Sequence, residues 1–160
     1  MDRDNQSEQV VLLFDYYGQG SQDLHTSFKQ AGYNFPAVVI EEDGFLPEDV
    51  ISVFGFFLGD FTKQAGNPGK PRYFNQIPVP EYWEISGNNS NGKVNDLSRE
   101  RGRIFYADPT HKRLVKTVDW LDERGIVRSS DHYNRYGALY ARTIFNAKGQ
   151  KVNKSWFSAS

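Results

Sequence analysis

Basic and aromatic side chains alternate along the carboxyl-terminal third of the chain, with a spacing that would gather them on one face of a β-sheet. They are Lys116, Trp120, Arg128, His132, Tyr140, Arg142, Lys154 and Trp156. Lys and Arg donate hydrogen bonds to carbonyl and hydroxyl oxygens, and aromatic rings stack on peptide planes or on sugars. The set therefore predicts a surface that binds an extended polar polypeptide or a partner protein. The alternative is a solvated basic face whose aromatic rings only shield the sheet.

The spacing of the residues does not indicate a catalytic or a metal-binding site. The chain has three histidines: His25, His111 and His132. They fall in a predicted helix, turn and strand, without the paired spacing of metal ligands. The carboxylate-rich stretch at residues 41–49 has no neighbouring histidine and no EF-hand spacing. We therefore predict no catalytic residue, no metal site and no cofactor.

A twelve-residue repeat supplies the sheet that would position the basic and aromatic residues. Asp122–Gly125, Asn134–Gly137 and Asn146–Gly149 share the pattern Asp/Asn-x-x-Gly, which is typical of a type I hairpin turn closed by a left-handed glycine. The residues between the turns are rich in β-branched and aromatic types. The repeat predicts a β-meander of at least four antiparallel strands: 114–121, 126–133, 138–145 and 150–157.

The register of this meander follows if each turn pairs the residue before Asp or Asn with the second residue after Gly. One face then carries the side chains that pack: Val115, Leu121, Val127, Tyr133, Leu139 and Phe145. The other face carries the eight basic and aromatic residues. In this register Trp120 lies opposite Arg128, and Arg142 lies opposite Lys154.

The first fifty residues have a different pattern, typical of a βαβ unit. Val10–Phe14 predicts a strand that is buried on both faces, and Ser21 predicts the start of a helix that ends at Ala31 before Gly32. Ala37–Ile40 predicts a second strand. The loop after the first strand contains two glycines, but it lacks the third glycine of a dinucleotide fingerprint.

Further strand and turn signals connect these two regions. Ser52–Leu58 predicts an aromatic strand, and the prolines within Tyr73–Ile85 predict an extended segment at a sheet edge or crossing the sheet. Asn88–Gly92 and Arg99–Gly102 predict turns, and Arg103–Ala107 predicts a strand. Residues 50–160 are therefore predicted to form a predominantly β region.

Composition sets broader limits on the class of protein. The 160 residues include no cysteine, and 38% are hydrophobic, which favours a folded domain without disulfides. No apolar run reaches the length of a membrane span and the polar start does not look like a signal peptide, so we expect a cytoplasmic protein. Residues 1–98 contain six Lys or Arg and 14 Asp or Glu, whereas residues 99–160 contain 13 and six. The basic half could dock on an acidic partner, but no nucleic-acid-binding motif is present.

Several short stretches carry a resemblance to a known family. They are Asp23–His25, Glu42–Glu48, Tyr73–Gln76, Pro78–Pro80 with Tyr82–Ile85, Val118–Trp120 and Ser130–Asn134. These stretches resemble the GtfB type, the non-catalytic stabilising subunit (chaperone) of the accessory Sec system glycosylation complex. The resemblance extends from about Val11 to Phe157.

The resemblance implies an α+β fold in which a GT-B-like body carries an extended antiparallel β-sheet as an add-on domain. It divides the chain into a disordered start at 1–9, a partial βαβ piece at 10–49 and the add-on sheet at 50–160, with a mobile loop at 59–71. Members of the family continue past this sheet into a full GT-B-like body. The chain is therefore expected to be an amino-terminal fragment.

The resemblance also implies a function and partners. The subunit would bind a catalytic O-GlcNAc transferase of the GtfA type in a hetero-oligomer, together with the serine-rich repeat adhesin polypeptide that the complex glycosylates. It would not be an enzyme itself, and it would lie in the cytoplasm or peripherally at the inner face of the cell membrane. One alternative is the amino-terminal piece of the catalytic retaining glycosyltransferase itself, which has the same layout. Another treats the turn repeats as a cell-wall-binding array.

Overall fold

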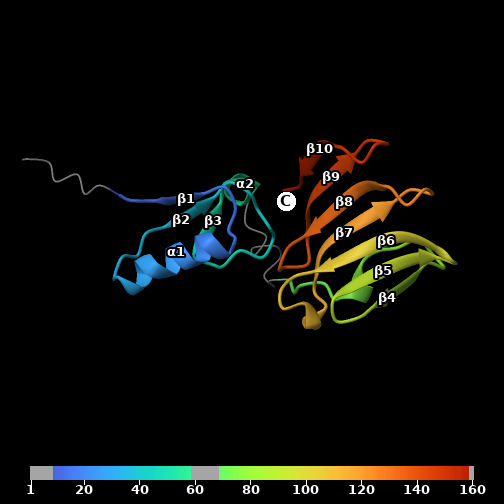
Figure 1. Cartoon of the computed structure of the whole chain (residues 1–160), viewed down its shortest axis with the longest axis horizontal. Coiled ribbons are helices and arrows are strands. Elements are labelled where there is room, and N and C mark those ends of the chain that lie inside the picture. Colours follow the sequence, from blue (N-terminus) through green and yellow to red (C-terminus); the bar gives the residue numbers. More distant parts are fainter. Residues whose placement is uncertain (1–8, 59–68, 159–160) are drawn as a thin grey trace, which may run out of the picture. The chain divides into compact units, whose positions relative to one another are not determined.

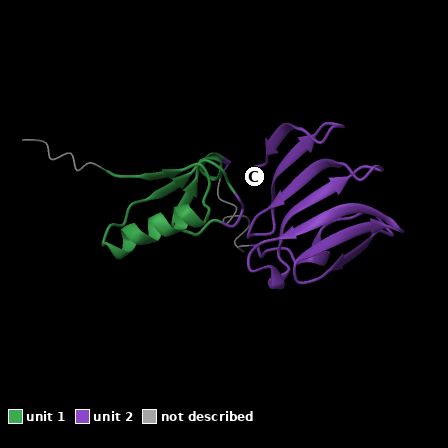
Figure 2. Cartoon of the chain, viewed as in Figure 1, with its two compact units in different colours: residues 1–42, 46–57 green, residues 43–45, 58–160 purple. Residues whose placement is uncertain are grey.

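The chain forms two compact units in a computed structural model, which describes residues 9–58 and 69–158. The first unit comprises residues 1–42 and 46–57, and the second comprises residues 43–45 and 58–160 (Figure 2). The sequence places the boundary at residue 50 instead. Most of the predicted disordered start and of the predicted mobile loop, namely residues 1–8 and 59–68, lies outside the described residues.

The first unit is a small parallel sheet with one long helix. In chain order its elements are β1 (Leu12–Phe14), α1 (Gln19–Gln30), β2 (Ala37–Val39), β3 (Val50–Ser52) and α2 (Val53–Leu58). The strands pair in the order β1-β2-β3, all parallel (Figure 1). This arrangement confirms the predicted βαβ unit and adds a third strand to it.

Helix α1 begins earlier than the sequence predicts. Its N-cap is Gly18, and Ser21 lies inside the first turn, where its hydroxyl donates to the Tyr16 carbonyl oxygen at 2.9 Å. The helix ends before Gly32, whose φ of +88° is the left-handed conformation expected of a helix stop. On its buried side His25 is only 2% exposed, and its Nδ1 lies 2.8 Å from the Tyr17 hydroxyl.

Only one face of the parallel sheet is packed by the described residues. Ala37, Val39 and Val50 are buried in one cluster, with Leu12 and Phe14 against it. The cross-strand row on the opposite face starts with Leu13, which is 65% exposed, and ends with Ile51, which is 48% exposed. The prediction that the first strand is buried on both faces is therefore wrong for the described part of the chain.

The predicted strand at residues 52–58 is also wrong. The strand β3 ends at Ser52, and the apolar residues that follow form the short helix α2. The Ser52 hydroxyl accepts a hydrogen bond from the Gly55 backbone N–H at 2.7 Å, as a helix-capping serine does. A short apolar run cannot be assigned to strand or helix by its periodicity, and here the capping serine favours the helix.

The second unit is a seven-stranded antiparallel sheet in which every strand pairs with its neighbour in sequence (Figure 1). Its strands are β4 (Glu84–Gly87), β5 (Asn91–Asp96), β6 (Arg99–Tyr106), β7 (Val115–Leu121), β8 (Val127–Tyr133), β9 (Leu139–Phe145) and β10 (Lys151–Trp156). Two short 3-10 helices, η2 (Phe74–Gln76) and η3 (Thr110–Lys112), lie in its connections. The last four strands confirm the predicted meander to within one residue at every end.

The three repeated turns have the predicted geometry. Gly125, Gly137 and Gly149 have φ values of +78°, +75° and +74°, and each donates its N–H to the carbonyl of the Asp or Asn three residues earlier at 3.0 Å. The Asn134 side chain accepts hydrogen bonds from Tyr136 N–H and Ala138 N–H, both at 3.0 Å. The pattern Asp/Asn-x-x-Gly is therefore the local cause of the hairpins.

A β-bulge follows each repeated turn, and no residue type in the sequence indicates it. The first pair after each turn is as predicted: Leu121 with Val127, Tyr133 with Leu139, and Phe145 with Lys151. The pairing skips the next residue on the second strand, so that the register shifts by one. The residues at these bulges are Arg128, Tyr140 and Val152.

One face of the sheet is covered by the segment that precedes β4. Phe74, Ile77, Val79 and Trp83 from this segment pack against a buried cluster on the strands. The members of the cluster on the strands are Val94, Ile104, Tyr106, Val115, Val118 and Tyr133. We call this side of the sheet the core face. The proline-containing segment therefore crosses the sheet, one of its two predicted positions.

The predicted turn at Arg99–Gly102 is wrong, because these residues belong to β6. The turn lies earlier, where Leu97 has a φ of +53°. Gly102 allows close packing, since a Cβ there would lie 3.2 Å from the Trp120 ring and from Val94, tighter than most side-chain contacts. A glycine that allows close packing was thus interpreted as a turn residue.

Candidate binding face of the seven-stranded sheet

The side of the sheet opposite the core face carries two cross-strand rows, which we call the polar face. Residues directly opposite each other on neighbouring strands point to the same side, so the pairing defines each row. The first row contains Ser86, Lys93, Arg103, Asp119, Ser130, Thr143 and Lys154. The second contains Asn91, Phe105, Thr117, His132, Ala141 and Trp156. The first row crosses the whole sheet.

The eight predicted binding residues do not share one face. His132, Lys154 and Trp156 lie on the polar face, and the Tyr140 ring lies between His132 and Trp156, with centroid distances of 6.2 and 5.8 Å. The Lys154 Nζ stands 4.2 Å from the centre of the Trp156 ring. These four of the eight residues form a single aromatic and basic group.

The other four residues are displaced by the bulges. Trp120 pairs with Ser129 rather than Arg128, and Arg142 pairs with Ser155 rather than Lys154. Both side chains therefore lie on the core face, on the same side of the sheet as Val118. The remaining two lie at bulges: Lys116, whose Nζ is 3.7 Å from the Asp43 carboxylate, and Arg128, whose guanidinium is 3.6 Å from the Asp122 carboxylate. The predicted single face is wrong, because each bulge moves the following residues to the other side.

Trp120 and Arg142 share one buried carboxylate on the core face. Asp131 is 4% exposed, and its two oxygens accept hydrogen bonds from Arg142 Nε at 2.5 Å and Arg142 Nη2 at 3.1 Å. The Trp120 indole N–H donates to the same carboxylate at 3.0 Å. The hydrogen bond to the Asp131 carboxylate raises the pKa of the Arg142 guanidinium above its usual value. These contacts give Trp120 and Arg142 a role in stability.

We predict that Asp131→Ala lowers the free energy of unfolding by about 2–3 kcal/mol, because it leaves the indole N–H and the guanidinium without their acceptor. The value lies below that of a fully buried ion pair, since the Arg142 side chain is 43% exposed. Urea unfolding followed by circular dichroism measures the change. The control is Glu123→Ala, whose exposed carboxylate lies 3.9 Å from Arg99 and should contribute less than about 1 kcal/mol. Equal losses in the two variants would contradict the role assigned to Asp131.

His132 lies on the polar face and has a lowered pKa. Its Nε2 lies 2.9 Å from the Thr143 hydroxyl oxygen. Burial lowers the pKa of His132 to about 4, and Lys154 contributes in the same direction while Asp131 opposes it. The neutral imidazole is therefore the form that the folded sheet accommodates at neutral pH.

We predict a loss of stability in mild acid that depends on His132. Its folded pKa of about 4 lies below the ordinary value of 6.5, so the unfolded chain takes up the proton first as the pH falls. The contribution is present above pH 6.5 and is lost toward pH 4, by ~1–2 kcal/mol for a partly exposed ring. Urea midpoints at pH 7 and pH 4.5 test this expectation. His132→Gln should make the pH dependence shallower, and an unchanged slope would contradict it.

The described residues that sequence reasoning missed lie on strands β5 to β7 of the polar face. Lys93 and Arg103 are exposed and flank Glu100, whose carboxylate they contact at 3.1 and 2.6 Å. Hydrogen bonds from Arg103 and then Lys93 lower the pKa of Glu100. Phe105 is 45% exposed, between the buried residues Ile104 and Tyr106. The alternation of exposed and buried residues in β6 could have indicated these positions.

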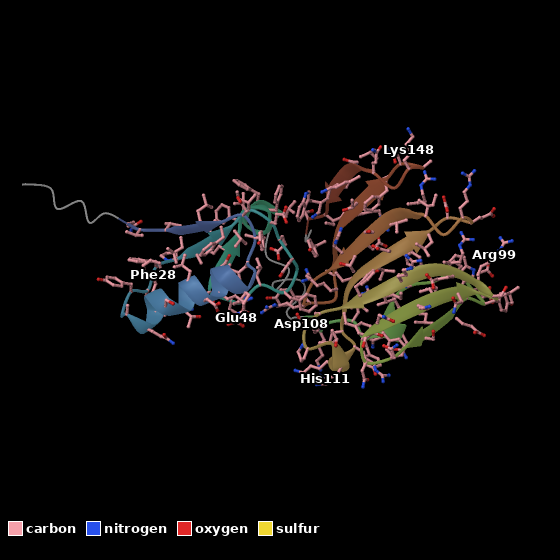
Figure 3. The ribbon with its side chains drawn as sticks, in the orientation of Figure 1. Phe28, Glu48, Arg99, Asp108, His111 and Lys148 are labelled. Atoms are coloured by element: carbon pink, nitrogen blue, oxygen red, sulfur yellow. The ribbon has the colours of Figure 1, made fainter. Side chains whose placement is uncertain are left out.

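Figure 3 shows Arg99 and Lys148 at one end of this sheet and Asp108 with His111 at the other. Lys148 is exposed in the turn between β9 and β10, and it serves below as a control position. Across residues 9–58 and 69–158, no three His, Cys, Asp or Glu side chains lie close enough to hold a metal ion. Within the same ranges, neither helix is long and apolar enough to cross a membrane.

The chain has a known fold. A similar fold occurs in the Glycosylation Associate Protein (Gap123) complex from Streptococcus agalactiae, with a TM-score of 0.67 over 94% of this chain and 35% of that chain. The sequences are only 10% identical. The likeness therefore concerns the fold alone: a parallel sheet joined to an extended antiparallel sheet.

Sequence comparison identifies the family more narrowly. Residues 11–57 match the GtfB N-terminal domain, and residues 83–160 match the GtfB middle domain. The chain belongs to the GtfB family. It is 45% identical over 149 residues to the UDP-N-acetylglucosamine--peptide N-acetylglucosaminyltransferase stabilizing protein GtfB of Streptococcus gordonii, which covers 93% of this chain and 32% of that protein.

A solved structure agrees with this assignment. The crystal structure of a GtfA/B complex bound to UDP and GlcNAc contains a chain that is 46% identical, with a TM-score of 0.83 over 93% of this chain and 32% of that chain. This chain thus spans about a third of the length of the relatives that it matches. The family and the fold that the sequence suggested are both confirmed.

Proposed function

We propose that this chain is a non-catalytic subunit that stabilises a peptide N-acetylglucosaminyltransferase by binding to it. The observation that carries the proposal is the 45% identity, over 93% of the chain, with a relative that is named a stabilizing protein. The GtfA/B complex is a second support, because a 46% identical chain is found there in a complex. The serine-rich adhesin as acceptor and the cytoplasmic location, peripheral to the membrane, are further parts of this proposal.

The polar face of the sheet is the surface that we assign to the partner or the acceptor polypeptide. Its exposed part presents Lys93 and Arg103 beside Phe105, with Thr117 on the neighbouring strand. The Lys, Arg and Thr side chains donate hydrogen bonds to carbonyl and hydroxyl oxygens, which a Ser- and Thr-rich chain offers along its length. The core face is less suited, since the segment of Phe74 and Ile77 packs against it. His132, Tyr140, Lys154 and Trp156 extend the polar face toward β10.

A glycosylation assay with separated components tests the proposed function. The catalytic subunit, UDP-GlcNAc and a Ser-rich peptide are incubated with and without this chain, and the chain is also assayed alone. We expect no transfer by the chain alone and faster or longer-lasting transfer when both proteins are present. Transfer by the chain alone would favour the alternative, in which the chain is a piece of the catalytic enzyme. No effect on the catalytic subunit would contradict the stabilising role.

A further inference from the structure

Three separate chain segments meet at the turn between β8 and β9. The turn is Asn134–Gly137, and residues 43–45 and 69–72 lie against it. All three segments belong to the second unit. In sequence, the two outer segments lie on either side of residues 46–57, which carry β3 and α2 and belong to the first unit. We call residues 43–45 the first strap and residues 69–72 the second strap.

The first strap is fixed to the turn by backbone and side-chain contacts. The Gly44 carbonyl oxygen accepts a hydrogen bond from the Arg135 N–H at 2.8 Å. The Asp43 carboxylate lies 3.7 Å from the Lys116 Nζ. A Cβ on Gly44 would lie 2.6 Å from the Tyr133 carbonyl oxygen, so the backbone of the strap touches the end of β8.

The second strap approaches the same turn equally closely. The Arg72 Nε donates a hydrogen bond to the Gly137 carbonyl oxygen at 2.7 Å. A Cβ on Gly69 would overlap with the Tyr136 carbonyl oxygen, and a Cβ on Gly137 would overlap with the Lys70 carbonyl oxygen. Glycine is the residue that allows two backbones to lie so close together. The glycines of the strap and of the turn therefore fit each other.

The equivalent turns of the repeat lack such a cover. Gly125 and Gly149 have the same place in their turns as Gly137 and similar φ values of +78° and +74°. Among the described residues, no atom lies within 4 Å of a Cβ built on either glycine. The cover is therefore not needed to form the turn itself.

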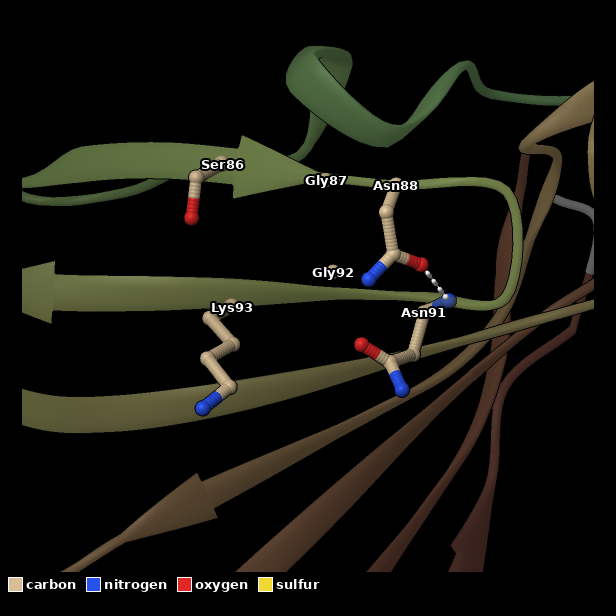
Figure 4. A pocket seen from close by; sticks show the side chains of 6 residues that line it. All are labelled: Ser86, Gly87, Asn88, Asn91, Gly92 and Lys93. Atoms are coloured by element: carbon tan, nitrogen blue, oxygen red, sulfur yellow. Dashed lines mark hydrogen bonds between the residues drawn. The ribbon is translucent and has the colours of Figure 1, made fainter.

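The β4–β5 turn, at the same end of the sheet as the β8–β9 turn, gives a second contrast. The Asn88 side-chain oxygen closes it by accepting from the Ser90 and Asn91 N–H groups at 2.7 and 3.0 Å (Figure 4). A depression of about 260 Å³, lined in part by Asn88 and Asn91, borders this turn. The two straps are thus a special feature of the β8–β9 turn.

The part of the chain between the straps buries little surface by itself. Strand β3 has three residues and lies at the edge of its sheet, and α2 has six residues. Phe56 and Phe57 of α2 are 73% and 78% exposed, and the buried apolar side chains of residues 46–57 are Leu46 and Val50. Elements this short are marginal without support. Holding the chain on both sides lowers the entropy lost when these residues become ordered.

We propose that the β8–β9 turn is a clamp on the two straps, and that β3 and α2 stay ordered only while the clamp is closed. Opening the clamp releases residues 46–57, exposes Leu46 and Val50, and leaves the edge of β2 unpaired. Helix α1 and the seven-stranded sheet remain folded in this open form. The large sheet thereby controls the third strand of the small one. This inference does not depend on the proposed function.

Hydrogen exchange of the whole chain, measured by mass spectrometry, tests the clamp. The amides of residues 50–57 should exchange about tenfold faster in Gly69→Ala and in Gly137→Ala than in the parent chain, because both variants open the clamp. The matched control is Gly149→Ala, which places the same left-handed alanine in a turn without a strap. It should leave the exchange of residues 50–57 unchanged, even where it lowers the stability of the whole sheet.

The parent chain supplies a test that does not require any variant to fold. Opening of residues 50–57 should depend less steeply on urea concentration than opening of β7, since it exposes less surface. An equally steep dependence would show that these residues open only when the whole sheet unfolds, which would overturn the clamp. Unchanged exchange of residues 50–57 in both strap variants, or an equal acceleration in Gly149→Ala, would overturn it as well.

Discussion

Replacing Tyr133 by alanine should lower the free energy of unfolding by about 3–4 kcal/mol, because it removes a large ring from the middle of the core face. Tyr133 is 2% exposed and belongs to the buried cluster with Val115 and Val118. The Arg72 guanidinium also lies over its ring, 5.2 Å from the centre. Urea unfolding monitored by tryptophan fluorescence and circular dichroism measures the loss.

Phe105→Ala is the matched control for this prediction. It removes an aromatic ring from the same sheet, but from a position that is 45% exposed on the polar face. Its effect on stability should stay below about 1 kcal/mol, as is usual for exposed positions. If both variants lose the same stability, the assignment of the two faces is wrong.

Gly44→Ala should destabilise the second unit by about 2–4 kcal/mol, since neither the backbone conformation nor the space at this position admits a side chain. Gly44 has a φ of +81°, and a Cβ there would lie 2.6 Å from the Tyr133 carbonyl oxygen and 2.9 Å from the Tyr140 ring. The Gly44 carbonyl also accepts a hydrogen bond from the Arg135 N–H at 2.8 Å. The short segment at residues 43–45 is thereby held against the turn after β8.

Gly125→Ala separates the two causes of this loss. Gly125 has a similar φ of +78°, but no atom lies within 4 Å of the position of its Cβ. It should therefore cost only about 1 kcal/mol, the strain of a left-handed alanine. A comparable loss in both variants would show that the close contact at Gly44 has no influence on stability. Differential scanning calorimetry of the two variants gives the comparison directly.

The local signals in the sequence predicted most of the large sheet. Each Asp/Asn-x-x-Gly turn fixes its own geometry through a side-chain acceptor and a left-handed glycine, so the hairpins follow from four residues each. Strand ends and the first cross-strand pair then follow from the turn. The first two parallel strands followed equally well, because Val10–Phe14 and Ala37–Ile40 are short apolar runs between loop signals, whereas β3 was not predicted.

The candidate site was predicted less well, for a physical reason. A bulge shifts the register by one residue and exchanges the two faces beyond it, while no residue type marks its position. Trp120 and Arg142 were thus placed on the wrong side, although their partner Asp131 lies in the same meander. Gly102 shows the converse problem, since a glycine that packs against Trp120 looks like a turn in sequence. Long-range contacts decide both cases, and local patterns do not contain them.

We propose that this chain stabilises a catalytic glycosyltransferase through the polar face. The most direct test is the melting temperature of the catalytic subunit, measured with increasing concentrations of this chain, since a ligand that binds only the folded state raises it. We expect a concentration-dependent rise that is lost in the double variant Lys93→Glu with Arg103→Glu and kept in Lys148→Glu, at an exposed hairpin tip. An unchanged melting temperature would contradict the stabilising role, and an equal rise with the double variant would contradict the assignment of the catalytic partner to the polar face.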